Sequence, residues 1–129
     1  MHRTPLQIRF NDIDMLGHVN NVIFGHYYDL AKTDYFLHKT TYNPIFGKDE
    51  KFIIMVHAEH DYLAPCFLTD TLFVETTLVK VGERSLHFLQ EIVDDKGVVR
   101  ARSRSVMSTF DKATGKSFPI KGEWEFFEQ

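Results

Sequence analysis

The chain has 129 residues, the size of one domain, and 43% of them are hydrophobic, so it can bury a sizeable core and is not a disordered chain. Its net charge is −3, with neither half strongly basic, which argues against a protein that binds nucleic acid through a broad basic face. We therefore expect a single domain over residues 1–129 and no nucleic-acid partner.

Cysteine content and targeting signals favour a cytoplasmic protein. Cys66 is the single cysteine, so an internal disulfide and a cysteine-based metal cluster are excluded. It stands between Pro65 and Phe67, an apolar setting that predicts a small buried side chain and not a reactive thiol. Residues 1–5 open no apolar signal sequence, and no apolar run approaches the roughly 18 residues of a membrane span. We expect a soluble protein with no membrane partner.

A short strand and a polar loop come first in the chain. Leu6, Ile8 and Phe10 alternate with polar residues, which predicts a strand over residues 6–10 with one buried face. The ten residues after Asn11, residues 12–21, hold two carboxylates, an imidazole and two amides. Polar groups concentrated between a strand and a helix suggest a reactive site, because chemistry needs charges and hydrogen bonds that rigid elements hold in place.

A long helix is expected from about Asn21 to His38. Apolar side chains cover most of its circumference, so this helix must be largely enclosed. Its faces are an apolar stripe of Phe24, Tyr28, Ala31 and Tyr35 and a narrow polar strip of His26, Asp29, Lys32 and Thr33. Asn20 or Asn21 can cap the first turn, because a short amide side chain accepts hydrogen bonds from free backbone N–H groups.

Four more strands are expected after a loop over residues 40–51. Their ranges are 52–63, 71–81, 85–93 and 98–110. Turn residues, including Gly82, Gly97 and Gly115, separate the later strands from one another and from the C-terminal segment. Residues 124–127 form an apolar tail, which we expect to be a last strand or a docking segment.

This order of elements predicts an α+β fold. One strand and one helix precede four strands in a meander, and a long apolar helix must be covered by a strongly bent antiparallel sheet. The strand expected over residues 98–110 fits this role because its two faces differ. The small side chains that leave room for a helix are Ala101, Ser103 and Ser105, and the opposite face carries Arg100, Arg102 and Arg104.

The segment from Arg9 to Asn21, RFNDIDMLGHVNN, resembles the active-site segment of the hotdog-fold thioesterases, in particular the 4-hydroxybenzoyl-CoA thioesterase-like group. Weaker similarity extends along nearly the whole chain, including residues 59–65 and 79–82. The resemblance implies a long central helix wrapped by a five- or six-stranded antiparallel sheet. It also implies hydrolysis of acyl thioesters of coenzyme A or of acyl-carrier protein, at sites that lie between subunits of a homodimer or homotetramer. We expect no cofactor.

The resemblance assigns the catalytic carboxylate to Asp14, which attacks the thioester carbonyl or activates water. Asp12 is the rival, because carboxylates two residues apart in an extended segment point the same way; we expect it to be a structural hydrogen-bond acceptor. His18 aligns with a catalytic histidine of the plant acyl-carrier-protein thioesterases. Leu16 replaces an asparagine of those enzymes, so their full mechanism does not transfer, and His18 either serves the carbonyl or orders the loop.

The remaining candidate residues are close to Asp14 and His18 in the sequence. Asn21 stands where related enzymes carry Tyr or His near the substrate carbonyl, and its amide can donate to a developing oxyanion, whereas Asn20 is the better helix cap. Gly17 allows close backbone approach and positive φ, and free N–H groups at the helix start can polarise the thioester oxygen. Phe24 belongs to the core stripe and can also line an acyl pocket. We expect catalytic roles for Asp14, His18 and Asn21 and substrate contacts from Gly17, Asn20 and Phe24.

Two other residue patterns are weaker indications of a functional site. His57, Glu59 and Asp61 would share one strand face, but nothing else in the pattern indicates metal ligands, and no metal site is expected. The arginine row of residues 100–104 can match coenzyme A phosphates, although we favour a solvated outer face or a subunit interface.

Two other functions stay open. The first is a non-catalytic acyl-binding protein that keeps the fold. The second is a hydratase or dehydratase of the same fold, and those enzymes carry an Asp-x-Asn-Pro-x-His pattern. Asp14 and His18 are four residues apart with no Asn-Pro between them, which counts against this second function.

Overall fold

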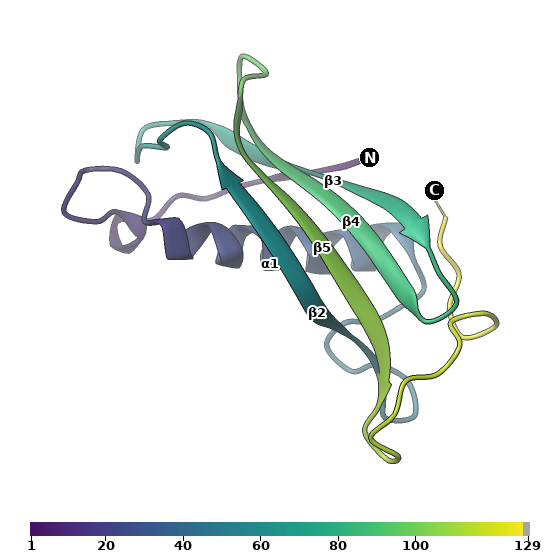
Figure 1. The fold of residues 1–129 in the computed structure, drawn as a ribbon. Helices are drawn as coiled ribbons and strands as arrows, with labels where there is room; N and C mark the ends of the chain where they lie inside the picture. Colours follow the sequence, from purple (N-terminus) through teal and green to yellow (C-terminus); the bar gives the residue numbers. More distant parts are fainter. Residues whose placement is uncertain (128–129) are drawn as a thin grey trace.

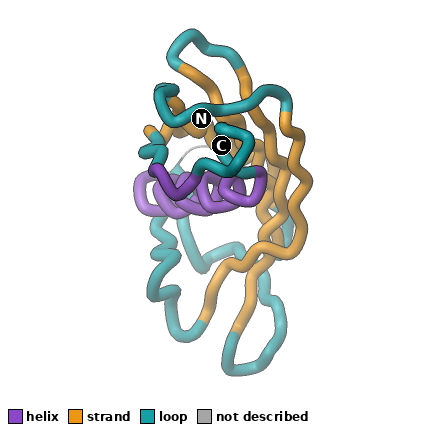
Figure 2. Tube along the Cα trace, turned by 90° about the vertical axis from the view of Figure 1, so that its left-hand side faces the viewer, coloured by secondary structure: helices purple, strands orange, loops and turns teal. Residues whose placement is uncertain are grey.

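The computed structural model describes residues 1–127, in which one long helix lies across one face of a five-stranded antiparallel sheet (Figure 1). The elements are β1 (His2–Pro5), the short 3-10 helix η1 (Phe10–Asp12), α1 (Asn21–Lys39), β2 (Lys51–Tyr62), β3 (Leu72–Val81), β4 (Ser85–Asp94) and β5 (Val99–Asp111). The strand order is β1-β3-β4-β5-β2, and the sheet curves along one side of the helix (Figure 2). The expected α+β architecture is confirmed; the last two residues of the proposed 1–129 domain lie outside the described residues.

The ends of α1 are fixed by local hydrogen bonds. The side-chain oxygen of Asn20 accepts from the backbone N–H of Val22 at 2.9 Å, so Asn20 is the N-cap. At the other end the hydroxyl of Thr40 donates to the carbonyl oxygen of Phe36 at 2.7 Å. The helix therefore starts immediately after the polar loop, and its first turn lies next to that loop.

The core lies between α1 and the inner face of the sheet. The apolar stripe predicted for the helix is buried, and so are the small residues Ala101, Ser103 and Ser105 of β5 that face it. Two packed groups divide this core. The first surrounds the N-terminal half of α1 and includes Val19, Phe24, Tyr28, Ala31, Val74, Ile92 and Ala101, and the second surrounds its C-terminal half and includes Tyr35, Phe36, Tyr42, Leu86, Phe88 and Trp124. The first group is the one on which the polar loop rests.

The prediction of a strand over residues 6–10 is wrong. The first strand, β1, is four residues earlier and pairs with β3, whereas residues 6–9 form no strand ladder and Phe10 begins η1 and is exposed. Leu6 and Ile8 do pack against the core, which explains the alternation. An alternation of apolar and polar residues indicates which side chains face the core. It does not indicate whether the backbone pairs with a neighbouring strand.

The predicted polar strip of α1 also needs correction, because Lys32 is only 5% exposed. Its ammonium lies 3.3 Å from Met55 Sδ and 3.7 Å from Asp29 Oδ1. Burial lowers the pKa of Lys32, and the nearby carboxylate of Asp29 opposes that shift. The expectation that α1 is largely enclosed is also wrong, because the apolar side chains of Leu30 and Leu37 are exposed. The sheet covers α1 on one side only.

The two remaining expectations concern the tail and the membrane. Trp124 is buried against Tyr42, and Phe126 forms an isolated bridge with Thr40, so the apolar tail is a docking segment. Within residues 1–127, α1 lacks the continuous apolar length that a bilayer-crossing helix needs.

Candidate functional site

The polar loop between η1 and α1 folds back on itself. The N–H of Asp14 donates to the carbonyl oxygen of His18 at 3.1 Å, and the N–H of Gly17 donates to the carbonyl oxygen of Asp14 at 3.0 Å. Ile13 and Val19 form an antiparallel bridge that closes the turn. Gly17 has a φ of 86°, a conformation that a side chain at this position would strain. The turn therefore brings the side chains of Asp14 and His18 to the same end of the loop.

Asp14 and His18 form a partly exposed pair. Oδ1 of Asp14 accepts from the N–H of Leu16 at 2.9 Å, which holds the carboxylate in one orientation. The same oxygen lies 3.9 Å from Nδ1 of His18, and the two side chains are 24% and 29% exposed. Nδ1 of His18 also lies 3.4 Å from the carbonyl oxygen of Val19. A carboxylate within reach of an imidazole at a solvent-accessible position can act on a bound electrophile.

Asp12 is a structural acceptor, as predicted. Its carboxylate is 1% exposed and accepts from the N–H of Arg9 at 3.0 Å and from the hydroxyl of Tyr27 at 2.7 Å. Burial acts to raise the pKa of Asp12, but these hydrogen bonds and the guanidinium of Arg9 outweigh it and hold the pKa below its usual range. Burial and the Asp12 carboxylate raise the pKa of Tyr27. Asp12 thus ties the loop to α1 and faces away from solvent.

We predict that Tyr27→Phe lowers the free energy of unfolding by about 1.5–3 kcal/mol at pH 7, because a buried hydrogen bond to a charged group is lost. The lowered pKa of Asp12 makes its contribution complete above the unfolded-state value of about 3.9 and lost as pH falls through the folded-state value. The difference between wild type and variant in urea unfolding should therefore shrink toward pH 3.

Tyr28→Phe is the matched control, because the buried hydroxyl of Tyr28 has no hydrogen-bond partner within residues 1–127. Its removal should not destabilise the protein. Equal losses in both variants would contradict the role given to Asp12.

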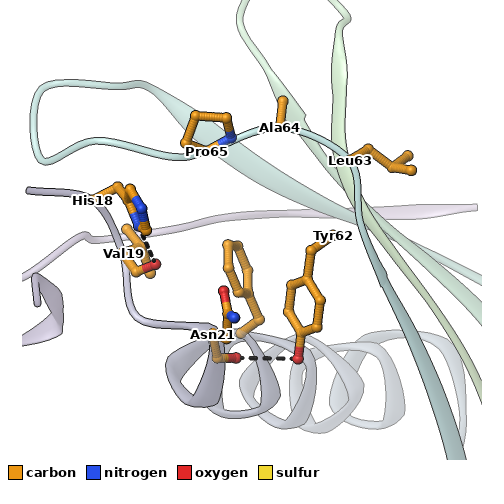
Figure 3. Close-up of a pocket in the computed structure, with 8 residues that line it drawn as sticks. His18, Val19, Asn21, Tyr62, Leu63, Ala64 and Pro65 are labelled. Carbon is orange, nitrogen blue, oxygen red and sulfur yellow. Dashed lines mark hydrogen bonds between the residues drawn. The ribbon is translucent and has the colours of Figure 1, made fainter. Parts of the chain in front are cut away.

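A hollow of about 230 Å³ opens beside this loop, between the start of α1 and the segment after β2 (Figure 3). Its lining residues are His18, Val19, Asn21, Phe24, Tyr62, Leu63, Ala64 and Pro65. Three of the predicted site residues, His18, Asn21 and Phe24, thus come together on its wall. Asp14 and Gly17 lie in the adjoining turn and are not part of the lining, and the side chain of Asn20 is occupied by the helix cap.

Sequence reasoning missed the far wall of this hollow. The hydroxyl of Tyr62 donates to the carbonyl oxygen of Asn21 at 3.3 Å (Figure 3). The ring of Tyr62 lies 5.4 Å from that of Phe24. Residues 59–65 showed similarity to the thioesterases, but nothing in the sequence says that the end of β2 reaches the start of α1.

Arg100 holds that wall in place and is not free to bind phosphate. Its backbone oxygen accepts from the N–H groups of Leu63 and Ala64, and its guanidinium donates to the carbonyl oxygen of Pro65 at 2.7 Å. The same guanidinium pairs with Asp70 and Asp94 at 2.9 and 3.0 Å. The predicted outer row is therefore partly structural.

The other arginines of the row point outward, as expected. Arg102 pairs with Glu91 at 2.8 Å, and Arg104 is exposed on the outer face. That face also carries a hollow of about 450 Å³ whose lining includes Arg104, His57 and Glu59 but none of the predicted site residues.

The remaining candidates from the sequence are Cys66 and the strand face of His57, Glu59 and Asp61. Cys66 is fully buried, and burial raises the pKa of its thiol to about 11, so it is the structural cysteine that was predicted. His57 lies 2.9 Å from Glu59, but among the described residues Asp61 does not join them in a cluster of metal ligands.

Comparisons with known proteins converge on one class of enzyme. The family model described as the thioesterase-like superfamily matches residues 8–125. The fold is similar to a thioesterase from Thermus thermophilus crystallised with coenzyme A and zinc, with a TM-score of 0.80, 30% identity, and coverage of 94% of this chain and 91% of that one. A predicted thioesterase from Bacillus stearothermophilus is also similar, with a TM-score of 0.82, 25% identity, and coverage of 94% and 88%. No curated protein matches the chain significantly.

Proposed function

Because the chain belongs to the thioesterase-like superfamily and is a thioester hydrolase of the hotdog fold, we propose that it hydrolyses acyl thioesters of coenzyme A, with Asp14 as nucleophile or general base. The observation that carries this proposal is the Asp14–His18 pair at the mouth of a hollow that ends on the first turn of α1. A reacting carbonyl bound in that hollow would contact His18 and the N-terminus of α1, and the carboxylate of Asp14 would reach it from the adjoining turn.

Asp14 is fixed for either role by the N–H of Leu16, which uses one carboxylate oxygen. As nucleophile, Asp14 adds to the thioester carbonyl carbon, the C–S bond breaks, and the resulting anhydride is opened by water. As general base, it takes a proton from a water molecule that attacks the same carbon. Both routes release the free acid and the thiol of the carrier.

The carbonyl oxygen needs donors where its negative charge develops. His18 and the amide of Asn21 line the hollow, and the positive end of the α1 dipole faces the same space. Phe24, buried at the bottom of the first helical turn, gives the acyl group an apolar contact. Gly17 keeps the turn close to the carrier, and Asn20 contributes through the cap that holds the helix start.

Coenzyme A is the proposed carrier because the Thermus thermophilus relative was crystallised with it. An acyl-carrier protein is the alternative, since both carriers end in the same type of thiol arm. We place the reaction in the cytoplasm, in keeping with a single buried thiol and no disulfide.

A second copy of the chain is proposed to complete the site. β2 is an edge strand whose middle exposes the apolar side chains of Ile54, Met55 and Val56. Antiparallel pairing of two β2 strands would bury this surface and remove the free edge. In such a symmetric pair, the start of the second copy's β2 lies beside Tyr62 at the end of the first, next to the hollow. A homodimer is therefore the expected minimum, and two dimers can form a homotetramer.

A substrate panel tests the proposal. The purified protein should release thiol from a subset of acyl-CoA esters that differ in chain length and aromatic character, at rates well above spontaneous hydrolysis. The same acyl groups on acyl-carrier protein distinguish the carrier. Tight binding of acyl-CoA in calorimetry without turnover of any ester would instead support the acyl-binding alternative, and release of an unsaturated or hydrated acyl-CoA would support the hydratase alternative.

A further inference from the structure

Three potential metal ligands converge at a place far from the thioesterase site. His2 on β1 and Asp34 and His38 on α1 bring one ligand atom each to within 4.8 Å of one another. Nε2 of His2 lies 2.7 Å from Oδ2 of Asp34, and Nδ1 of His38 lies 3.0 Å from Oδ1 of the same carboxylate. Two ring nitrogens from different elements thus point at the two oxygens of one carboxylate.

We propose that His2, Asp34 and His38 form a binding site for a divalent transition-metal ion, with zinc as the preferred ion and water as its fourth ligand. Two imidazoles and one carboxylate are a common ligand set for zinc. Asp34 and His38 are four residues apart on one face of α1, and His2 supplies the third ligand from the neighbouring strand. The sequence could not show this set, because 32 residues separate His2 from Asp34.

The surroundings already orient the ligands. The hydroxyl of Thr4 donates to Oδ2 of Asp34 at 2.7 Å and fixes the carboxylate from outside the cluster, as partners behind metal ligands do. The ring of His2 packs edge-on against Tyr35 at 6.4 Å and stacks with that of His38 at 5.3 Å.

The geometry leaves room for an ion with small adjustments. Zinc holds nitrogen and oxygen ligands at roughly 2.0–2.2 Å, so tetrahedral neighbours stand about 3.4 Å apart. The two close pairs must open by less than about 1 Å, and Nδ1 of His38 must leave its contact of 2.9 Å with the carbonyl oxygen of Asp34. His38 is 61% exposed, which gives the ion and its water ligand an entry path.

Such an ion would connect an edge strand to the helix. Within the described part of the chain, β1 pairs with β3 alone, over four residues, so it depends on side chains for the rest of its attachment. A metal that joins His2 to the C-terminal half of α1 would fasten β1 against fraying. This role is structural and independent of thioester hydrolysis.

Isothermal titration calorimetry with zinc chloride on metal-free protein tests the site, together with thermal unfolding with and without zinc. We expect one zinc per chain and a rise in Tm of about 10 °C at a free zinc concentration 100 times the dissociation constant, reversed by EDTA. Asp34→Asn and His38→Ala should lower the affinity at least 100-fold and abolish the rise. Because each variant is compared with itself in the absence of zinc, its own loss of stability does not affect the result.

His26→Ala is the matched control, since this exposed histidine is on the same helix but outside the cluster. It should bind zinc as the wild type does, and so should Asp14→Asn, which separates this site from the proposed catalytic one. Absence of stoichiometric binding in the wild type, or unchanged binding in Asp34→Asn and His38→Ala, would overturn the proposal.

Discussion

Asp14→Asn is expected to lower kcat for acyl-CoA hydrolysis about 1000-fold without changing the fold, because removal of a nucleophile or general base costs two to four orders of magnitude. The asparagine keeps the size of the side chain and an oxygen that can accept from the N–H of Leu16, so the turn is preserved. What is lost is the basicity of the carboxylate. Steady-state kinetics on the best ester of the panel, with circular dichroism and thermal unfolding, measures both parts of the expectation.

Asp95→Asn provides the matched control, because this carboxylate is exposed on the β4–β5 turn and does not line the hollow, so its loss should leave kcat unchanged. A folded Asp14→Asn protein with kcat within about threefold of the wild type would refute the role of Asp14. A single turnover in ¹⁸O-labelled water then tests for the anhydride route. Label in the carboxylate of Asp14 identifies that route, because it arises when water opens the anhydride at the carboxyl carbon of Asp14, whereas direct attack of water on the thioester labels only the free acid.

Val56→Asp should convert the proposed homodimer into monomers at micromolar concentration and reduce thioesterase activity in parallel. Val56 is 58% exposed and stands at the bulge of β2, between the paired residues Met55 and His57. In a symmetric interface every substitution occurs twice, so the change buries two carboxylates in an apolar contact. We expect the dissociation constant of the dimer to rise at least 100-fold, as measured by analytical ultracentrifugation.

Val98→Asp makes the same chemical change at an exposed valine of the β4–β5 turn, away from the β2 edge, and should leave both assembly and activity intact. If Val56→Asp stays dimeric, or if wild-type monomers hydrolyse acyl-CoA at full rate, the proposal that a second copy completes the site fails.

The sequence predicted the fold closely where periodicity and turns agree. The helix and the four later strands were each placed within two residues of their ends, because the apolar stripe of α1 and the Gly-containing turns are local signals. The prediction that these four strands form a meander is wrong for β2, which pairs with β5 and not with β3, so only β3, β4 and β5 follow one another in the sheet. The first strand was misplaced because Leu6 and Ile8 show the alternation of a strand while their backbone forms no strand ladder. Lys32 was misplaced because a long side chain on a polar strip can still be covered by a neighbouring strand.

Only the loop side of the candidate site could be predicted from the sequence. The loop residues Asp14, His18 and Asn21 lie within eight positions of each other, and their resemblance to a known segment made them the candidates. Tyr62 reaches the same hollow from 41 residues beyond Asn21, a proximity that depends on the curvature of the sheet. Long-range contacts of this kind have no local signature in a single sequence.

The manner in which Arg100 holds the segment after β2 has a consequence for how the substrate range of this protein can evolve. The hydrogen bonds that Arg100 makes to residues 63–65 all use backbone atoms of that segment: the N–H of Leu63, the N–H of Ala64 and the carbonyl oxygen of Pro65. The side chains of Leu63 and Ala64 therefore carry no part of that attachment, although they line the hollow. Mutations there can reshape the hollow proposed to bind the acyl group while the main chain stays where it is, so new specificity can arise without a loss of stability that selection would remove.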